Sequence, residues 1–92
     1  MSGFTTMSEV RDANREAGFH FFDPDTMRFF DSRIETRLID GRFFVTSEKG
    51  PDGVRRFTVR RAMPDGTINT VGDFQGHATR RDAEARIEEA RR

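Results

Sequence analysis

Residues 33–74 read RIETRLIDGRFFVTSEKGPDGVRRFTVRRAMPDGTINTVGDF, and this stretch decides the fold. It contains four short runs that are rich in β-branched and aromatic residues, and glycine-containing turn sequences separate these runs. Such a pattern is typical of antiparallel strands joined by short connections. The sequence therefore predicts a four-stranded antiparallel meander over residues 33–73.

The pair Asp40-Gly41 predicts how the first two strands align. It is typical of a two-residue type I′ turn, which would place Ile39 opposite Arg42. Because side chains alternate between the two faces of a strand, this register collects apolar residues on one face. That core face is expected to contain Ile34, Leu38, Phe43 and Val45. The opposite face is expected to contain Arg37, Ile39 and Phe44.

Pro64-Asp65-Gly66 predicts the turn between the third and fourth strands. The three residues fit a type I turn followed by a glycine in the left-handed conformation. In the resulting register Val59 lies opposite Val71, and Phe57 lies near Asp73. We also expect a bulge where the fourth strand ends.

Helix-start signals lie on both sides of the predicted sheet. Thr6 and Glu9 fit a capping box, and Asp23-Pro24 fits an N-cap followed by proline in the first turn. Thr79 fits an N-cap before a stretch with apolar residues at helical spacing. The sequence thus predicts one α+β domain over residues 1–92, with N-terminal helices within 7–31, the sheet over 33–73 and a C-terminal helix over 80–91 packed on it.

Composition narrows the class of protein. The chain has 16 basic and 16 acidic residues and no cysteine. Balanced charge is not typical of a general nucleic-acid binder, and the lack of cysteine excludes disulfides and thiolate metal sites. No apolar run approaches the length of a membrane span, and the N-terminus lacks the features of a signal peptide. We therefore expect a cytoplasmic protein with no membrane partner.

The reactive residue types form no pattern that predicts catalysis or metal binding. The two histidines, His20 and His77, lie on opposite sides of the meander in the sequence and have no third ligand at metal-binding spacing. Thr79 lies near His77, but it is expected to cap a helix. We therefore expect no catalytic residue, no metal and no cofactor, and hence a protein that is not an enzyme.

The arginines of the third strand allow two interpretations. Arg56 and Arg60 share one face, where arginines beside Phe44 would suit phosphates and a stacked base. Alternatively, they form a solvated strand face that discourages aggregation between sheet edges. The sequence favours the solvated face, because alternation brings only two of the arginines together.

Phe43 and Phe44 are adjacent, so they point to opposite sides of the sheet. If Phe43 lies in the core, Phe44 is either covered by the N-terminal helical segment or part of an exposed apolar contact patch. The sequence favours cover of Phe44 by the N-terminal segment, and an exposed contact patch remains the alternative. The candidate interaction face comprises Arg37, Ile39, Phe44, Arg56 and Arg60.

Three segments resemble small uncharacterised proteins encoded by actinobacterial phages and prophages. These segments read FDPDTMRFF (22–30), FVTSE (44–48) and TVGDFQG (70–76), and the likeness spans about residues 20–87. The resemblance implies a phage accessory protein that acts in the cytoplasm of the host cell. It implies no activity and no site residues.

A second resemblance concerns the segment GHATRRDA (76–83), which is similar to the strand-to-helix joint of integrase arm-type DNA-binding domains. Those domains read DNA with a three-stranded sheet. This chain departs from them in its balanced charge and in the absence of Trp and Tyr from its strands.

The leading hypothesis is a non-enzymatic phage-encoded accessory protein that binds a host protein, with a defence or growth system as the candidate target. The alternative is a small nucleic-acid-binding module that uses the arginine-bearing sheet face. A homodimer formed through the sheet is compatible with both.

Overall fold

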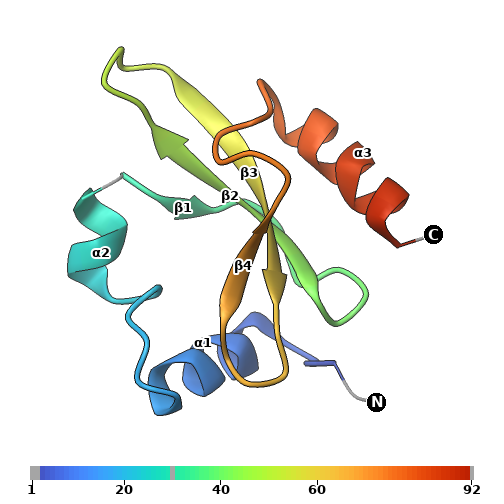
Figure 1. Ribbon diagram of the computed structural model, residues 1–92. Coiled ribbons are helices and arrows are strands. Elements are labelled where there is room, and N and C mark those ends of the chain that lie inside the picture. Colours follow the sequence, from blue (N-terminus) through green and yellow to red (C-terminus); the bar gives the residue numbers. More distant parts are fainter. Residues whose placement is uncertain (1–2, 30, 92) are drawn as a thin grey trace.

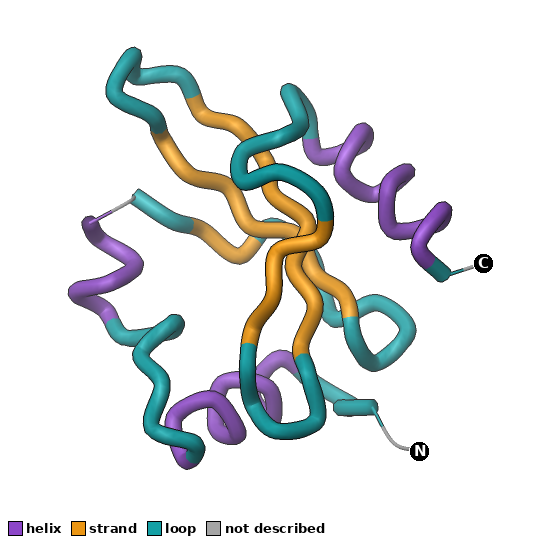
Figure 2. The backbone as a smooth tube through the Cα atoms, in the orientation of Figure 1, coloured by secondary structure: helices purple, strands orange, loops and turns teal. Residues whose placement is uncertain are grey.

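The computed structural model describes residues 3–29 and 31–91. The strands form one antiparallel sheet in the order β1-β2-β3-β4, with helices around it (Figure 1, Figure 2). The predicted α+β class and four-stranded meander are confirmed. The strands are β1 (Arg33–Ile34), β2 (Phe43–Lys49), β3 (Arg55–Ala62) and β4 (Ile68–Val71). The helices are α1 (Met7–Glu16), α2 (Pro24–Phe29) and α3 (Arg80–Ala90).

The C-terminal helix packs on one face of the sheet, which we call the α3 face. Phe43 and Val45 of β2 and Val59 of β3 point toward this helix, because alternate residues of a strand share a face. They form a core with Ala83 and Ile87, and none of the five side chains is more than 2% exposed.

The two long helices begin at the predicted caps. The Thr79 hydroxyl accepts a hydrogen bond from the Asp82 N–H at 3.1 Å, which starts α3. At the start of α1 the Thr6 hydroxyl accepts from the Glu9 N–H at 3.3 Å, and the Glu9 carboxylate accepts from the Thr6 N–H at 3.1 Å. These bonds satisfy backbone donors that have no partner within the helix.

Helix α1 and the segment that follows it cover the other face of the sheet, which we call the N-terminal face (Figure 1). Phe44 is 0% exposed there and packs in a cluster with Val10. The Phe22 ring stacks on the Phe44 ring at 6.1 Å, and the Phe21 ring meets it edge-on at 6.3 Å. The N-terminal segment therefore covers Phe44, and no exposed patch forms around this ring.

Asn14 fixes α1 to the turn between β3 and β4. Its side chain is 2% exposed and donates a hydrogen bond to the Gly66 carbonyl at 2.7 Å. It also accepts from the Phe21 N–H at 3.2 Å. One buried amide thus joins α1 both to the segment that follows it and to the distant turn between β3 and β4.

The predicted register of the first hairpin is wrong by one residue. Asp40 and Gly41 do have positive φ angles of 55° and 68°, as a type I′ turn requires. However, Ile39 pairs with Phe43 instead of Arg42, and farther along Ile34 pairs with Thr46. Arg42 is therefore an extra residue in the turn that the two-residue prediction did not include.

This register changes which residues lie in the core. Leu38 packs in the cluster around Phe44, whereas Ile39 packs in the cluster around Phe43. Ile34 is 38% exposed. Of the predicted core face, only Phe43 and Val45 lie on the α3 face together. The prediction failed because residues 36–38 do not continue the regular ladder.

The second hairpin has the predicted register, with Val59 paired to Val71. The expected bulge after β4 is a longer excursion. Gly72 has a φ of 79°, and the chain returns to β3 only at His77, which bridges to Phe57. The predicted register therefore does not extend to Phe57, which pairs with His77, because residues 72–76 form a loop.

The predicted helix boundaries are close to the observed ones. Helix α1 ends at Glu16 instead of residue 17, and α3 ends at Ala90 instead of residue 91. Helix α2 ends at Phe29, and residue 30, which the prediction included, lies outside the described residues. Asp31 has a φ of 48°, so it is not helical. None of the described helices is long and apolar enough to cross a membrane.

Candidate functional site

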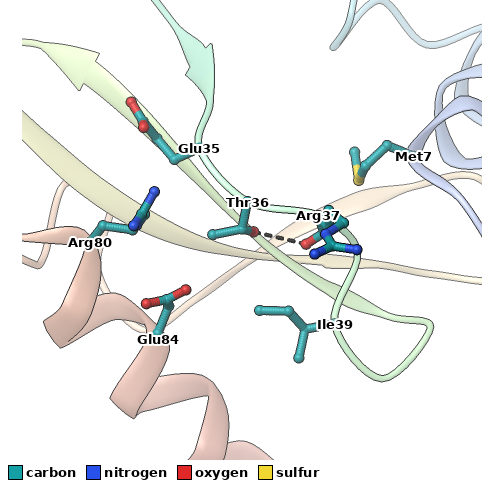
Figure 3. A pocket seen from close by; sticks show the side chains of 7 residues that line it. All are labelled: Met7, Glu35, Thr36, Arg37, Ile39, Arg80 and Glu84. Carbon is teal, nitrogen blue, oxygen red and sulfur yellow. Dashed lines mark hydrogen bonds between the residues drawn. The ribbon is translucent and has the colours of Figure 1, made fainter.

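A surface hollow lies between the chain after β1 and helix α3. We call it the β1 groove (Figure 3). Its volume is about 630 Å³. Arg80 and Glu84 extend into it from α3, and Met7 reaches it from α1 (Figure 3). The remaining lining residues are Glu35, Thr36, Arg37 and Ile39.

Thr36 explains why a groove forms at this point. Its hydroxyl accepts the Val45 N–H at 3.0 Å and donates to the Arg37 carbonyl at 2.9 Å. A side chain thus replaces the backbone partner that a regular ladder would supply, and residues 36–38 leave the sheet. A second hollow of about 420 Å³ shares Met7 and Arg37 with the first. Both hollows therefore flank the same irregular segment.

Strand β1 is an edge strand with its outer side open. The Glu35 N–H donates to the Val45 carbonyl at 2.8 Å, so Glu35 faces β2. Neighbouring residues of an antiparallel edge strand alternate in direction, and the N–H and C=O of Ile34 therefore point away from the sheet. Among residues 3–29 and 31–91, no hydrogen bond reaches these two groups. Such an edge can accept another strand.

The charged residues at the edge are of both signs. Arg33, Arg37 and Arg80 are exposed and form no ion pair with any described residue. Glu35 accepts a hydrogen bond from the Ser47 hydroxyl at 2.6 Å and is half-buried. Glu84 completes the set. The edge therefore carries both positive and negative side chains, and it is neither an acidic nor a basic surface.

The predicted candidate interaction face is divided between different surroundings. Arg37 and Ile39 both line the β1 groove. Phe44 lies in the core beneath the N-terminal segment, and Arg60 is 9% exposed. Arg56 lies near the hairpin tip, where its guanidinium donates to the Asp52 carboxylate at 3.0 Å and lowers the pKa of Asp52. The five residues thus do not form one continuous exposed surface.

Arg60 belongs to a buried polar network on the N-terminal face, the Glu48–Arg60 network. Its guanidinium lies 3.2 Å from the Glu48 carboxylate, which is 2% exposed. Hydroxyls of Thr46 and Thr58 donate to the two oxygens of that carboxylate at 2.6 and 2.8 Å. The guanidinium also donates to the Thr70 hydroxyl at 2.7 Å. The buried charges are therefore paired and hydrogen-bonded, as their burial requires.

The loop after β4 closes this network. The Gln75 N–H donates to the Thr58 hydroxyl, and the Gln75 side chain donates to the Glu48 carbonyl, both at 2.8 Å. The Arg60 guanidinium lies between two rings, 5.1 Å from Phe21 and 5.4 Å from Phe74. Strand alternation could have placed these polar residues on one face with Phe44. That face is buried, however, by this loop together with the Phe21 ring.

Two phenylalanine side chains are exposed beside another hollow. Phe29 of α2 is 82% exposed and Phe74 is 49% exposed. Both line a hollow of about 360 Å³, which we call the Phe29–Phe74 hollow. Its other lining residues are Lys49, Gly50, Pro51 and Gln75. Val54 is 48% exposed and accepts the Gly50 N–H through its carbonyl, so it adjoins the same hollow.

Each of the two histidines makes a contact that supports the local structure. His20 forms a hydrogen bond of 2.8 Å with the Asp23 carboxylate at the surface. The backbone of His77 bridges to Phe57. Within the part of the chain that the structure describes, no group of three or more His, Cys, Asp or Glu residues could hold a metal ion.

Comparison with known proteins places the chain in a family. Residues 6–88 match DUF7447, a family of unknown function. The chain belongs to this family. No curated protein and no solved structure matches the chain. Every lining residue of the β1 groove and of the Phe29–Phe74 hollow lies within the segment that matches DUF7447.

Proposed function

We propose that the chain is a non-enzymatic protein-binding module that contacts its partner through the Phe29–Phe74 hollow. The observation that carries this proposal is the 82% exposure of Phe29, beside the half-exposed ring of Phe74. Large apolar side chains that gather around a hollow at the surface are typical of protein contact sites. Aromatic residues are also enriched among the side chains that contribute most to binding.

The shape of this region supports the proposal. Gly50 and Pro51 of the hairpin tip, Phe29 of α2 and Phe74 line the hollow. Lys49 and Gln75 add polar groups to its lining. An apolar lining with a few polar groups suits the insertion of an apolar side chain from a partner.

We propose that the partner is a host protein and that the chain is a phage accessory protein acting in the host cytoplasm. The support is the resemblance of residues 22–30, 44–48 and 70–76 to proteins of actinobacterial phages and prophages. Two of these segments contain Phe29 and Phe74. A host defence or growth system is the candidate target.

The non-enzymatic part of the proposal rests on how the reactive side chains are used. The Thr79 hydroxyl caps α3, and the Glu48 carboxylate pairs with Arg60. His20 bonds to Asp23 at the surface. These contacts give structural roles to the groups that general acid–base or nucleophilic chemistry would need.

The nucleic-acid alternative has less support from the geometry. It relied on Arg56 and Arg60 acting together on an open sheet face. Arg60 is buried against Glu48, and Arg56 is paired with Asp52. This alternative predicts salt-dependent binding of DNA or RNA, so the absence of any mobility shift at low salt would remove it.

Capture from an actinobacterial host lysate tests the main proposal. The tagged chain is expected to retain one host protein in stoichiometric amount, and Phe29→Ser is expected to lose it. Phe29 is exposed, so the substitution should leave the unfolding free energy within about 0.5 kcal/mol of the parent value. Mass spectrometry of the eluates gives the readout.

Phe19→Ser is the matched control, because Phe19 is 44% exposed but does not line the hollow. It is expected to retain the same host protein. The proposal fails if no stoichiometric partner appears, or if Phe29→Ser retains the partner as well as Phe19→Ser does.

A further inference from the structure

We propose that two copies of this chain pair through their β1 edges, with Ile34 of one copy opposite Ile34 of the other. This surface is separate from the Phe29–Phe74 hollow, so the inference does not depend on the proposed function. We choose a second copy of the chain as the binding partner because the charged residues along the edge are complementary to the same residues of another copy.

The first step is the direction of the backbone groups. The N–H and C=O of Ile34 point away from β2, because the flanking residue Glu35 bonds to Val45. In an antiparallel pair related by a two-fold axis, the two Ile34 residues would exchange both hydrogen bonds. Every contact on one side of the axis is then repeated on the other. A short edge strand thereby gains twice the number of contacts that one set of residues provides.

The second step is the charge pattern. With Ile34 on the axis, Arg33 lies opposite Glu35 of the second copy, and Glu35 lies opposite Arg33 of the second copy. Arg33 is exposed and unpaired among the described residues. Opposite charges that face each other across two strands stabilise the pair, and like charges destabilise it. The edge is therefore complementary to itself in this register.

The neighbouring registers lack this complementarity. If the strands slide by two residues in one direction, Glu35 faces Glu35. In the other direction, Arg33 faces Arg33. Both alternatives bring like charges together. The charges at 33 and 35 thus select one alignment.

The third step is space. In the selected register, residues 31–33 of the second copy lie beside residues 35–37. The β1 groove lies along this irregular segment (Figure 3). The adjoining hollow of about 420 Å³ is also lined by residues of this segment, Arg37 and Leu38. They leave room for the chain that leads into β1 of the second copy.

The fourth step is rigidity of the edge. The Arg55 guanidinium donates to the Asp31 carbonyl and to the Ser47 hydroxyl, both at 2.8 Å. It also lies 2.8 Å from the Asp31 carboxylate. These contacts hold the start of β1 against β2 in the free chain. Pairing therefore needs little ordering of the edge, which reduces the entropy that association costs.

A charge swap tests the proposal on the full chain. Sedimentation equilibrium from about 10 μM to 1 mM is expected to show a monomer–dimer equilibrium. Arg33→Glu places Glu opposite Glu35, and Glu35→Arg places Arg opposite Arg33. Each single change is expected to raise the dimer dissociation constant at least about ten-fold. The double variant restores opposite charges and is expected to return the constant to within about three-fold of the parent value.

Two further variants identify the surface. Ile34→Pro removes the outward N–H without removing a bond to β2, and it is expected to abolish the dimer while circular dichroism stays native. Phe29→Ser is expected to leave the dimer unchanged. The inference is overturned if the chain stays monomeric at the highest concentration, or if the double variant dimerises no better than the single variants. A dimer that Phe29→Ser dissociates would assign self-association to the Phe29–Phe74 hollow and would also overturn it.

Discussion

The buried pair of Glu48 and Arg60 is the most demanding feature at the scale of single residues. Removing two charges from water is costly, and their mutual attraction offsets this cost only when the remaining hydrogen-bonding groups are also satisfied. Hydroxyls of Thr46 and Thr58 satisfy the carboxylate, and Thr70 satisfies part of the guanidinium. The network is therefore a structural unit of the N-terminal face.

Removing Arg60 alone should strongly destabilise the chain. Arg60→Met leaves the Glu48 carboxylate buried without its cation, and the expected loss of unfolding free energy is about 3–5 kcal/mol. Urea denaturation followed by circular dichroism measures this loss.

The double variant Arg60→Met, Glu48→Gln provides the matched comparison. The amide introduced by Glu48→Gln would carry no charge. Its oxygen would still accept a hydrogen bond from one of the two threonine hydroxyls, and its NH2 group would donate to the other. The double variant is therefore expected to be more stable than Arg60→Met alone. If it is less stable, the cost of Arg60→Met does not come from an uncompensated charge.

Sequence reasoning identified Arg60 but not its surroundings. Alternation placed Arg56 and Arg60 on the face of Phe44 and favoured a solvated strand face. Whether that face is exposed to solvent or buried depends on residues 72–76 and on Phe21, which are distant from Arg60 in the sequence. No local pattern reports that a loop will return across a strand, and the network could therefore not be predicted.

At the scale of elements, the two hairpins show what turn chemistry does and does not determine. The prediction for Pro64-Asp65-Gly66 included both the turn and the register, and both are confirmed for Val59 and Val71. At Asp40-Gly41 the local conformation is as predicted, but the pairing is not. A turn fixes the dihedral angles of two residues, whereas the ladder beyond it depends on every later pair.

Thr36 is the residue that decides the first hairpin. Its hydroxyl takes the Val45 N–H and allows the chain to leave the ladder. Threonine side chains compete with backbone groups for such bonds. The sequence contains Thr36, but nothing adjacent to it indicates that this competition succeeds here and not elsewhere.

The contact between α1 and the β3–β4 turn predicts a large effect at Gly66. A Cβ atom at this position would lie 2.4 Å from the Ala13 carbonyl oxygen, and the φ angle is 93°. Gly66→Ala therefore combines an unfavourable conformation with a clash against backbone, and we expect a loss of more than about 2 kcal/mol in unfolding free energy. Thermal or urea denaturation gives the value.

Gly53→Ala is the control for the conformational part of this effect. Gly53 also has a positive φ, 77°, but a Cβ atom there would meet nothing within 4 Å. Its expected cost is about 1–2 kcal/mol. Equal costs at the two glycines would mean that α1 shifts freely away from the turn, contrary to the bond between Asn14 and Gly66.

At the scale of the whole molecule, basic and acidic residues are equal in number, and local contacts shift the pKa values of several carboxyl groups. Four exposed carboxyl groups have lowered pKa values. Backbone N–H groups of Thr5 and Thr6 lower the pKa of Glu9, and the Thr67 N–H lowers that of Asp65. Arginine side chains do so for the remaining two, Asp40 and Asp52.

These shifts predict loss of stability in acid. A carboxyl with a lower pKa in the folded chain holds fewer protons when folded than when unfolded, so its contribution is complete above the unfolded value and is lost as the pH falls through the folded value. The reference values are 4.5 for Glu9 and 3.8 for the aspartates. The unfolding free energy should therefore be nearly constant above about pH 5 and decline below about pH 4.

Urea denaturation at a series of pH values tests this dependence. A variant with all four carboxyls neutralised, Glu9→Gln, Asp40→Asn, Asp52→Asn and Asp65→Asn, should show a shallower decline. An unchanged slope would assign the acid sensitivity to other carboxyl groups. The parent and variant should converge at the lowest pH, where these four side chains carry no charge in either chain.

The bond from Asn14 to Gly66 has a consequence for the order in which the chain acquires its structure during synthesis. The two residues are 52 positions apart, so α1 is made early but its anchor is made late. Long-range contacts of this kind are expected to form slowly because a large loop must close first. On the ribosome, Val10 and Phe44 would remain in water until the turn at residue 66 has emerged. The nascent chain therefore exposes the apolar surface around Val10 and Phe44 before synthesis is complete. Rapid completion of the second hairpin would bury that surface and limit aggregation.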